Sequence, residues 1–164
     1  MPNLDQPKLK STTGFILTRQ QQDSQTGVLL TYWVRAADQV FPITIPNQET
    51  VFFVLDAQVE TLQRILARFS GWRLANLALT DLNYQGVHGL YCRSLKVMRQ
   101  IVDLLRVSGI VMMEEDIRLT DRFLMERFIQ GGVSITQRAD QFKLRPAEVS
   151  PRFKILSIDL ETTM

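Results

Sequence analysis

The order of apolar segments over residues 51–113 constrains the fold of this chain more than any other feature. Short runs rich in β-branched and aromatic residues are typical of strands, whereas apolar residues three and four positions apart are typical of helices. The two patterns follow one another as strand, helix, strand, strand, helix and strand, over residues 51–55, 59–69, 72–79, 87–92, 94–107 and 110–113.

This βαββαβ order predicts a split βαβ, or ferredoxin-like, unit, the topology that RNA-recognition folds also use. Asp56 is expected to cap the first helix, and Gly71 follows the end of that helix. Ser108 and Gly109 are expected to stop the second helix. The sequence therefore predicts the α+β class, with the βαββαβ core at residues 51–114.

Antiparallel strands are expected before this core. Residues 14–19, 28–36 and 40–45 are rich in β-branched and aromatic residues and are separated by polar turn sequences. Pro42 and Pro46 predict that the third strand lies at a sheet edge or carries a bulge, because proline cannot donate to the ladder.

A short helix and a further strand are expected after the core. Thr120 or Asp121 can cap a helix that runs to Phe128, and the pair of glycines at 131–132 would end it. Residues 133–142 then predict a strand in a further sheet or hairpin.

The expected domain organisation has four parts. Residues 1–13 are polar and predict a flexible leader, and residues 14–142 predict the main domain. Residues 143–152, which include Pro146 and Pro151, predict a linker. Residues 153–164 predict the first strand of another domain, cut just inside it.

Composition excludes several classes of protein. The 164 residues are 45% hydrophobic and 22% charged, which is typical of a globular chain. No apolar run approaches the roughly 18 residues that a membrane span needs, and the N-terminus has no signal-peptide pattern. The single cysteine, Cys92, cannot form an internal disulfide, so a cytoplasmic location is expected. The net charge of +2 permits a nucleic-acid partner but is below that of a dedicated binder.

Asp159 and Glu161 form the one candidate catalytic pair. They lie two residues apart in a predicted strand, so their carboxylates point to the same side and can share a divalent cation. Magnesium prefers such oxygen ligands. The alternative is that the two residues only end a strand. A complete site would need further ligands that these 164 residues do not supply.

The same segment resembles a known family. Residues 153–163, Phe-Lys-Ile-Leu-Ser-Ile-Asp-Leu-Glu-Thr-Thr, are similar to the first exonuclease motif of family B DNA polymerases, whose core is Asp-x-Glu followed by Thr. Residues 116–128 resemble the segment just upstream of that motif. With the runs at 14–19 and 89–93, the similarity covers nearly the whole chain and points to the bacterial members of the family.

The resemblance implies a function for the parent protein. It would be a DNA-directed DNA polymerase with a 3′–5′ proofreading exonuclease, in which Asp159 and Glu161 are catalytic residues and ligands of Mg²⁺. Its partner would be a DNA primer–template, and a sliding clamp would bind through other regions. The main domain would help to form the template path, and the strands after it would lead into the exonuclease domain. This chain alone would be inactive.

A second function remains open, that of a free-standing RRM-like module that binds single-stranded nucleic acid or regulates another protein. Such folds stack bases on aromatic residues of their first and third strands, where this chain carries Phe52, Phe53 and Tyr91. One of the two phenylalanines must be core, because neighbours in a strand face opposite sides. Arg118 and Arg122 either position the junction between domains or contact a template strand.

Two other residues are expected to be structural. His88 is the lone histidine and has no cysteine or carboxylate at ligand spacing in the sequence. Cys92 has no base nearby in sequence and is expected to be a small buried side chain.

Overall fold

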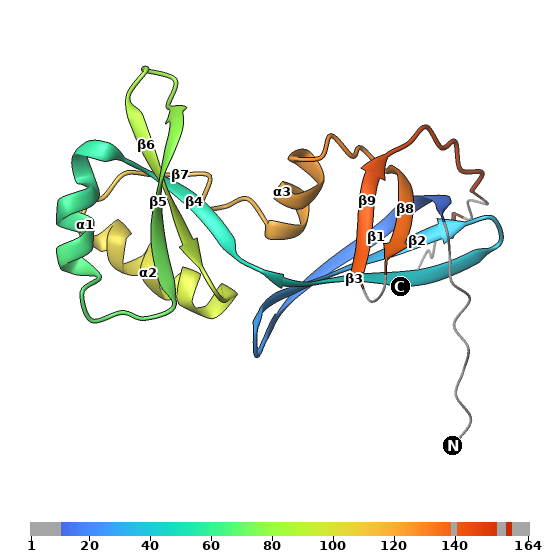
Figure 1. The fold of residues 1–164 in the computed structure, drawn as a ribbon, viewed down its shortest axis with the longest axis horizontal. Coiled ribbons are helices and arrows are strands. Elements are labelled where there is room, and N and C mark those ends of the chain that lie inside the picture. The colour runs from blue at the N-terminus through green and yellow to red at the C-terminus, as the bar shows by residue number, and fades with distance from the viewer. Residues whose placement is uncertain (1–10, 139–140, 154–156, 159–164) are drawn as a thin grey trace, which may run out of the picture.

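The computed structural model describes residues 11–138, 141–153 and 157–158. Two antiparallel sheets lie toward opposite ends of an elongated molecule, with one short helix between them (Figure 1). The α+β class predicted from the sequence is confirmed. Strands β3 and β4 follow one another almost without a break and carry the chain from one sheet to the other.

The first sheet, called sheet A, has five strands in the order β3-β2-β1-β8-β9. The predicted N-terminal strands are confirmed, and β3 lies at the edge, as its prolines require. The bounds are β1 Thr12–Ser24, β2 Gly27–Ala36, β3 Gln39–Gln48, β8 Gly132–Arg138 and β9 Gln141–Pro146.

The second sheet, called sheet B, has the order β5-β6-β4-β7. Numbered within the βαββαβ unit, this is the order 2-3-1-4 with antiparallel neighbours, which is the ferredoxin-like arrangement. The predicted topology is therefore confirmed. The bounds are β4 Thr50–Leu55, η1 Asp56–Gln58, α1 Val59–Ile65, β5 Trp72–Thr80, β6 Gly86–Cys92, α2 Leu95–Val107 and β7 Met112–Met113.

The start of the first helix differs from the prediction. Asp56 does not cap α1, because a 3-10 turn intervenes and the cap residue is Gln58, which makes no side-chain cap bond. The Asp56 carboxylate instead contacts His88, with 2.6 Å between Oδ1 and Nδ1. The second helix follows the prediction: Ser94 Oγ accepts a hydrogen bond from the backbone N–H of Val97 at 3.1 Å.

Part of the segment predicted as a linker forms a strand in the structure. Its first residues belong to β9, which pairs with β8, and Leu144 lies opposite Ile135 in the register. Leu144 is buried, so the strand contributes to the core of sheet A. Residues 1–10 and 159–164, which include most of the predicted leader and the carboxylate strand, lie outside the described residues.

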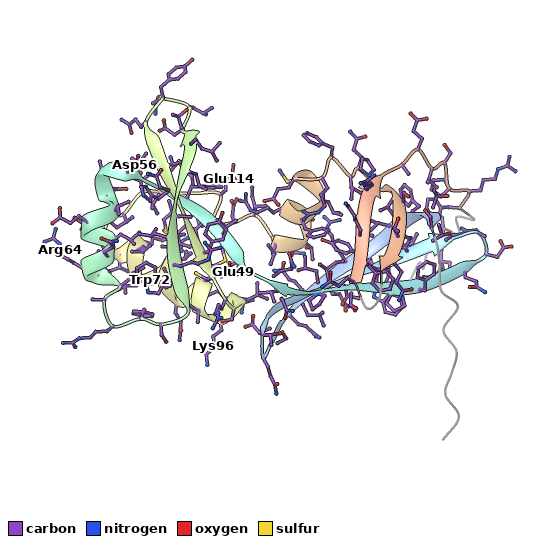
Figure 2. All side chains as sticks on the ribbon, viewed as in Figure 1. Glu49, Asp56, Arg64, Trp72, Lys96 and Glu114 are labelled. Atoms are coloured by element: carbon purple, nitrogen blue, oxygen red, sulfur yellow. The ribbon has the colours of Figure 1, made fainter. Side chains whose placement is uncertain are left out.

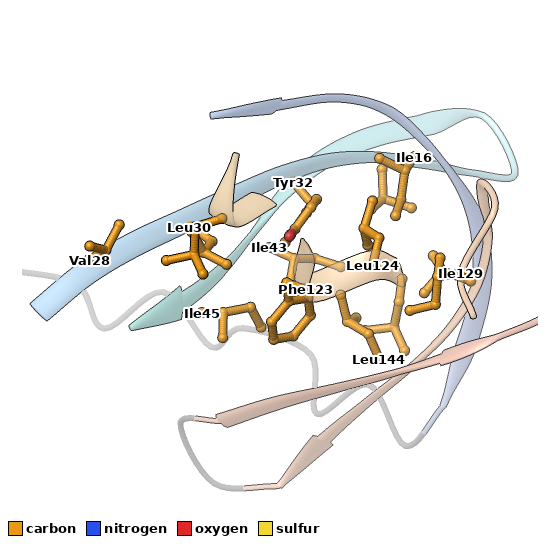
Figure 3. Packing of buried hydrophobic residues seen from close by; sticks show 14 residues of the cluster. Ile16, Val28, Leu30, Tyr32, Ile43, Ile45, Phe123, Leu124, Ile129 and Leu144 are labelled. Atoms are coloured by element: carbon orange, nitrogen blue, oxygen red, sulfur yellow. The ribbon is translucent and has the colours of Figure 1, made fainter. Parts of the chain in front are cut away.

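Helix α3, Leu119–Met125, packs against sheet A and closes its core (Figure 3). The rings of Tyr32 and Phe123 lie 5.7 Å apart, and the Tyr32 hydroxyl donates to the backbone oxygen of Thr120 at 2.8 Å. Burial raises the pKa of Tyr32 above its ordinary value, so its hydroxyl stays a donor. The α3 cap is Arg118, not Thr120 or Asp121 as predicted.

Helices α1 and α2 cover one face of sheet B and form a second, separate core. Phe52, Leu62, Leu90 and Ile101 are fully buried in it. Cys92 is buried there as predicted, and burial raises the pKa of its thiol to about 12, so the side chain stays a neutral thiol at ordinary pH.

The tip of the β1–β2 hairpin joins the two sheets. Asp23 lies at the start of α2, where its two carboxylate oxygens accept the backbone N–H groups of Leu95 at 2.6 Å and Lys96 at 3.1 Å. On the same strand, Gln21 accepts the N–H of Thr120 at the start of α3. Strand β1 of sheet A thus supplies hydrogen-bond acceptors to the first turns of two helices, α2 and α3.

Gly14, the first residue of one of the family-like runs, has no room for a side chain. A Cβ there would lie 2.5 Å from Val34 Cγ1 and 2.7 Å from the Arg35 carbonyl oxygen. Gly14→Ala is therefore expected to lower the free energy of unfolding by about 1–3 kcal/mol, the usual range for overpacking. Urea denaturation would measure the loss, with Thr13→Ala at the exposed neighbour as control. Equal midpoints for the two variants would contradict the prediction.

Candidate nucleic-acid interface

The face of sheet B away from α1 and α2 is the surface that RNA-recognition folds use for stacking. Phe52 does not reach it. Its side chain is 0% exposed and packs under the helices with Val54, whereas Phe53 points to the opposite face. The prediction that Phe52 stacks on a base is therefore wrong, because strand alternation gives that position to Phe53.

Tyr91 lies on this open face, but a cation already covers its ring. The Arg73 guanidinium carbon is 3.9 Å from the ring centroid, and Glu49 holds Arg73 with 2.5 Å between Oε2 and Nη2. The hydrogen bond to Glu49 raises the pKa of Arg73 above its ordinary value. The ring also leans over Gly89, where a Cβ would lie 2.9 Å from Tyr91 Cε2. Stacking of a base on Tyr91 stays a prediction, and the base would have to displace Arg73.

Arg122 is occupied within the protein. Its side chain is 10% exposed, its Nη2 lies 2.7 Å from Glu114 Oε2, and its guanidinium carbon lies 5.3 Å from the Phe53 ring. A buried, paired guanidinium is not available to a phosphate group, so the predicted template contact by Arg122 is wrong. The alternative prediction, that this segment positions the junction between domains, stays a prediction; among the described residues, Arg122 on α3 contacts Glu114 and the ring of Phe53 on β4.

Arg118 is exposed at the start of α3 and makes no ion pair among the residues that the structure describes. It lines a groove with Arg99 of α2, and Asp103 and Asp116 line the same groove. Its contact with a template strand stays a prediction.

Sequence reasoning missed Arg73 and Glu49 beside the open face, and it named Phe53 without deciding whether Phe52 or Phe53 lies on that face. The signal for Phe53 was its position next to Phe52 in a strand. The sequence shows that the two side chains face opposite sides of the sheet but not which of them faces the helices. Arg73 and Glu49 had no local signal, since their meeting with Tyr91 depends on the strand register that sets Arg73 opposite Tyr91.

The predicted metal ligands, Asp159 and Glu161, lie outside the described residues. Within the described ranges, no three or more His, Cys, Asp or Glu side chains are grouped so as to hold a metal ion. His88 contacts one carboxylate, that of Asp56, which the sequence had not indicated. No helix among the described residues has the length and apolar character to cross a membrane.

Comparison with known proteins gives three matches. Residues 50–110 match the family model described as DNA polymerase II, insertion domain. Over 156 residues the chain is 36% identical to DNA polymerase II of Escherichia coli, covering 92% of this chain and 20% of that protein. The family B DNA polymerase of the archaeon Pyrobaculum calidifontis has a similar fold, with a TM-score of 0.58 at 10% identity, over 71% of this chain and 16% of that one.

The predicted resemblance of this chain to family B DNA polymerases is thereby confirmed. Within that family, the sequence similarity is to DNA polymerase II, to which both the family model and the bacterial relative refer. The chain spans about a fifth of the length of that relative.

Proposed function

We propose that this chain is the N-terminal part of a DNA-directed DNA polymerase that also carries a 3′–5′ proofreading exonuclease. The observation that supports the proposal most is the 36% identity to DNA polymerase II over 156 residues. Residues 14–142 would form the N-terminal domain, which helps to build the template path beside the single-stranded template. By itself the chain would not catalyse either reaction, because it lacks most of the ligands of a metal site.

Asp159 and Glu161 are the residues we assign to Mg²⁺ in the exonuclease site of the parent. The donor set fits, since carboxylate oxygens are the ligands that this hard cation prefers. When bound, such ions activate a water molecule and stabilise the leaving 3′ oxygen. The role of this chain's residues would be to supply the two carboxylates that hold the cations.

The partner of the parent would be a DNA primer–template in the cytoplasm. We assign any contact with a sliding clamp to regions of the parent outside this chain.

A chimera tests the proposal. The matching region of E. coli DNA polymerase II is replaced by this chain, and template-dependent primer extension is measured. If this chain can replace the matching region, the rate of primer extension should stay within about tenfold of that of the unaltered enzyme. A tenfold loss corresponds to an increase of about 1.4 kcal/mol in the activation barrier. The control is the E. coli enzyme with the region deleted. A folded chimera no more active than the deletion would contradict the proposal.

A further inference from the structure

One end of the βαββαβ unit, beside the Arg73–Glu49 pair of the open face, carries cations and aromatic residues. At this end the α1–β5 loop and the β6–α2 loop meet, and the backbone N–H of Arg93 donates to the backbone oxygen of Gly71 at 2.9 Å. Figure 2 places Trp72 and Lys96 at the same end of the unit. We call this surface the basic loop end and define it by five residues, Arg68, Phe69, Trp72, Arg93 and Lys96.

Its three cations are exposed and free of carboxylates. Arg68, Arg93 and Lys96 make no ion pair with any residue that the structure describes. Two acidic groups at this end are already engaged: both oxygens of Asp23 accept backbone N–H groups of α2, and Glu49 binds Arg73. The local charge is therefore positive and without an internal partner, in contrast to the paired Arg122.

Hydrogen bonds fix the Trp72 indole and the backbone of Phe69 beside these cations. The Trp72 indole N–H donates to the Phe69 carbonyl oxygen at 3.0 Å, and the Phe69 N–H donates to the Leu66 oxygen at 2.9 Å. Phe69 is 36% exposed, and Trp72 is half-buried against the core. A cavity of about 410 Å³ opens here, lined by Glu49, Gly71, Trp72, Arg73 and Arg93. An exposed phenyl ring beside a hydrogen-bonded indole and unpaired cations is a combination that suits unpaired bases and their phosphates.

We propose that the basic loop end binds single-stranded DNA, with Arg68, Arg93 and Lys96 on the phosphates and a base stacked on Phe69 beside Trp72. Duplex DNA offers the same phosphates but no free base faces, so the single strand is the partner that uses both features. The identity of the nucleic acid as DNA rests on the proposed function. The proposal adds a contact surface at the end of sheet B, distinct from the stacking face predicted by analogy with RNA-recognition folds.

Fluorescence anisotropy with a labelled oligothymidine of about 16 nucleotides, the upper end of known site sizes, tests this proposal on the 164-residue chain. We expect binding at low salt that weakens as salt rises. Arg68→Glu with Arg93→Glu should weaken binding by at least about tenfold and flatten the salt slope by about one to two units, for the two lost phosphate contacts. Phe69→Ala should lower affinity by about tenfold without changing the salt slope.

The matched control is Lys143→Glu with Arg145→Glu on β9, where both side chains are exposed and the change in net charge is the same. Circular dichroism checks that each variant is folded. Equal losses in the two double variants would overturn the proposal, because total charge would then explain the binding. Equal affinity for a duplex of the same length, or no binding by the unaltered chain, would also overturn it. The chimera would still test the polymerase assignment independently.

Discussion

Alanine at both Asp159 and Glu161 is expected to reduce the 3′–5′ exonuclease activity of the chimera by about 1,000-fold. Loss of a catalytic cation removes several kcal/mol of transition-state stabilisation, and each 1.36 kcal/mol is tenfold in rate. Degradation of a single-stranded primer in excess Mg²⁺ would measure the loss. Primer extension should remain, because the assigned ligands belong to the exonuclease site alone.

Two comparisons make this result specific. Glu148→Ala removes an exposed carboxylate a few residues upstream and should leave the exonuclease unchanged. Asp159→Ala alone should approach the effect of the double variant, since ligands of one site act as a unit and their effects are not additive. Exonuclease activity that survives the double change would show that the two carboxylates only end a strand.

Phe52→Ala is expected to lower the free energy of unfolding by about 3–5 kcal/mol, the range for removing a large aromatic side chain from a core. Phe52 is fully buried between sheet B and the helices. The truncation therefore leaves a cavity that the surrounding side chains fill only in part. Urea denaturation followed by circular dichroism would measure the change, and tryptophan fluorescence gives a second probe because Trp72 packs against the same core.

Phe53→Ala is the matched control, since it deletes the same atoms one position along the strand. Phe53 is only partly buried, on the opposite face, so its loss should be clearly smaller. If the two variants have equal stability, or if Phe52→Ala costs less than Phe53→Ala, the assignment of the core face is wrong.

The order of elements could be predicted because it depends on short-range pattern. Apolar residues at helical spacing in α2, with Ser94 before them, specify that helix locally, and Pro42 confines β3 to an edge without reference to any partner. The ferredoxin-like sheet order followed from the order of elements, because few topologies connect them without crossing.

What the sequence did not reveal depends on contacts between distant residues. Phe52 and Phe53 are chemically identical, and only the placement of α1 and α2 decides which one is core. Asp56 has the right identity for a helix cap, yet His88, 32 residues away, takes its carboxylate. The early part of the predicted linker forms a strand because Leu144 finds a buried place opposite Ile135.

The same limits apply to the candidate site. Charge alone made Arg118 and Arg122 equal candidates for contact with a template strand. In the structure, however, it is Arg122 that pairs with Glu114 and lies over the ring of Phe53. The free cations of the basic loop end are spread over residues 68–96, and no spacing in the sequence brings them together.

The hydrogen bonds from α2 to Asp23 also link the segment at residues 50–110 to the strands before it. The matching family model, which is described as an insertion domain, covers residues 50–110. Yet the backbone N–H groups in the first turn of its longer helix donate to both carboxylate oxygens of Asp23, which lies 27 residues before the segment begins. Excised at its sequence borders, the segment would leave those amide groups to water, at about 0.5–2 kcal/mol for a lost cap. The segment that the family model matches is thus stabilised in part by a residue outside the matched range, at the start of α2.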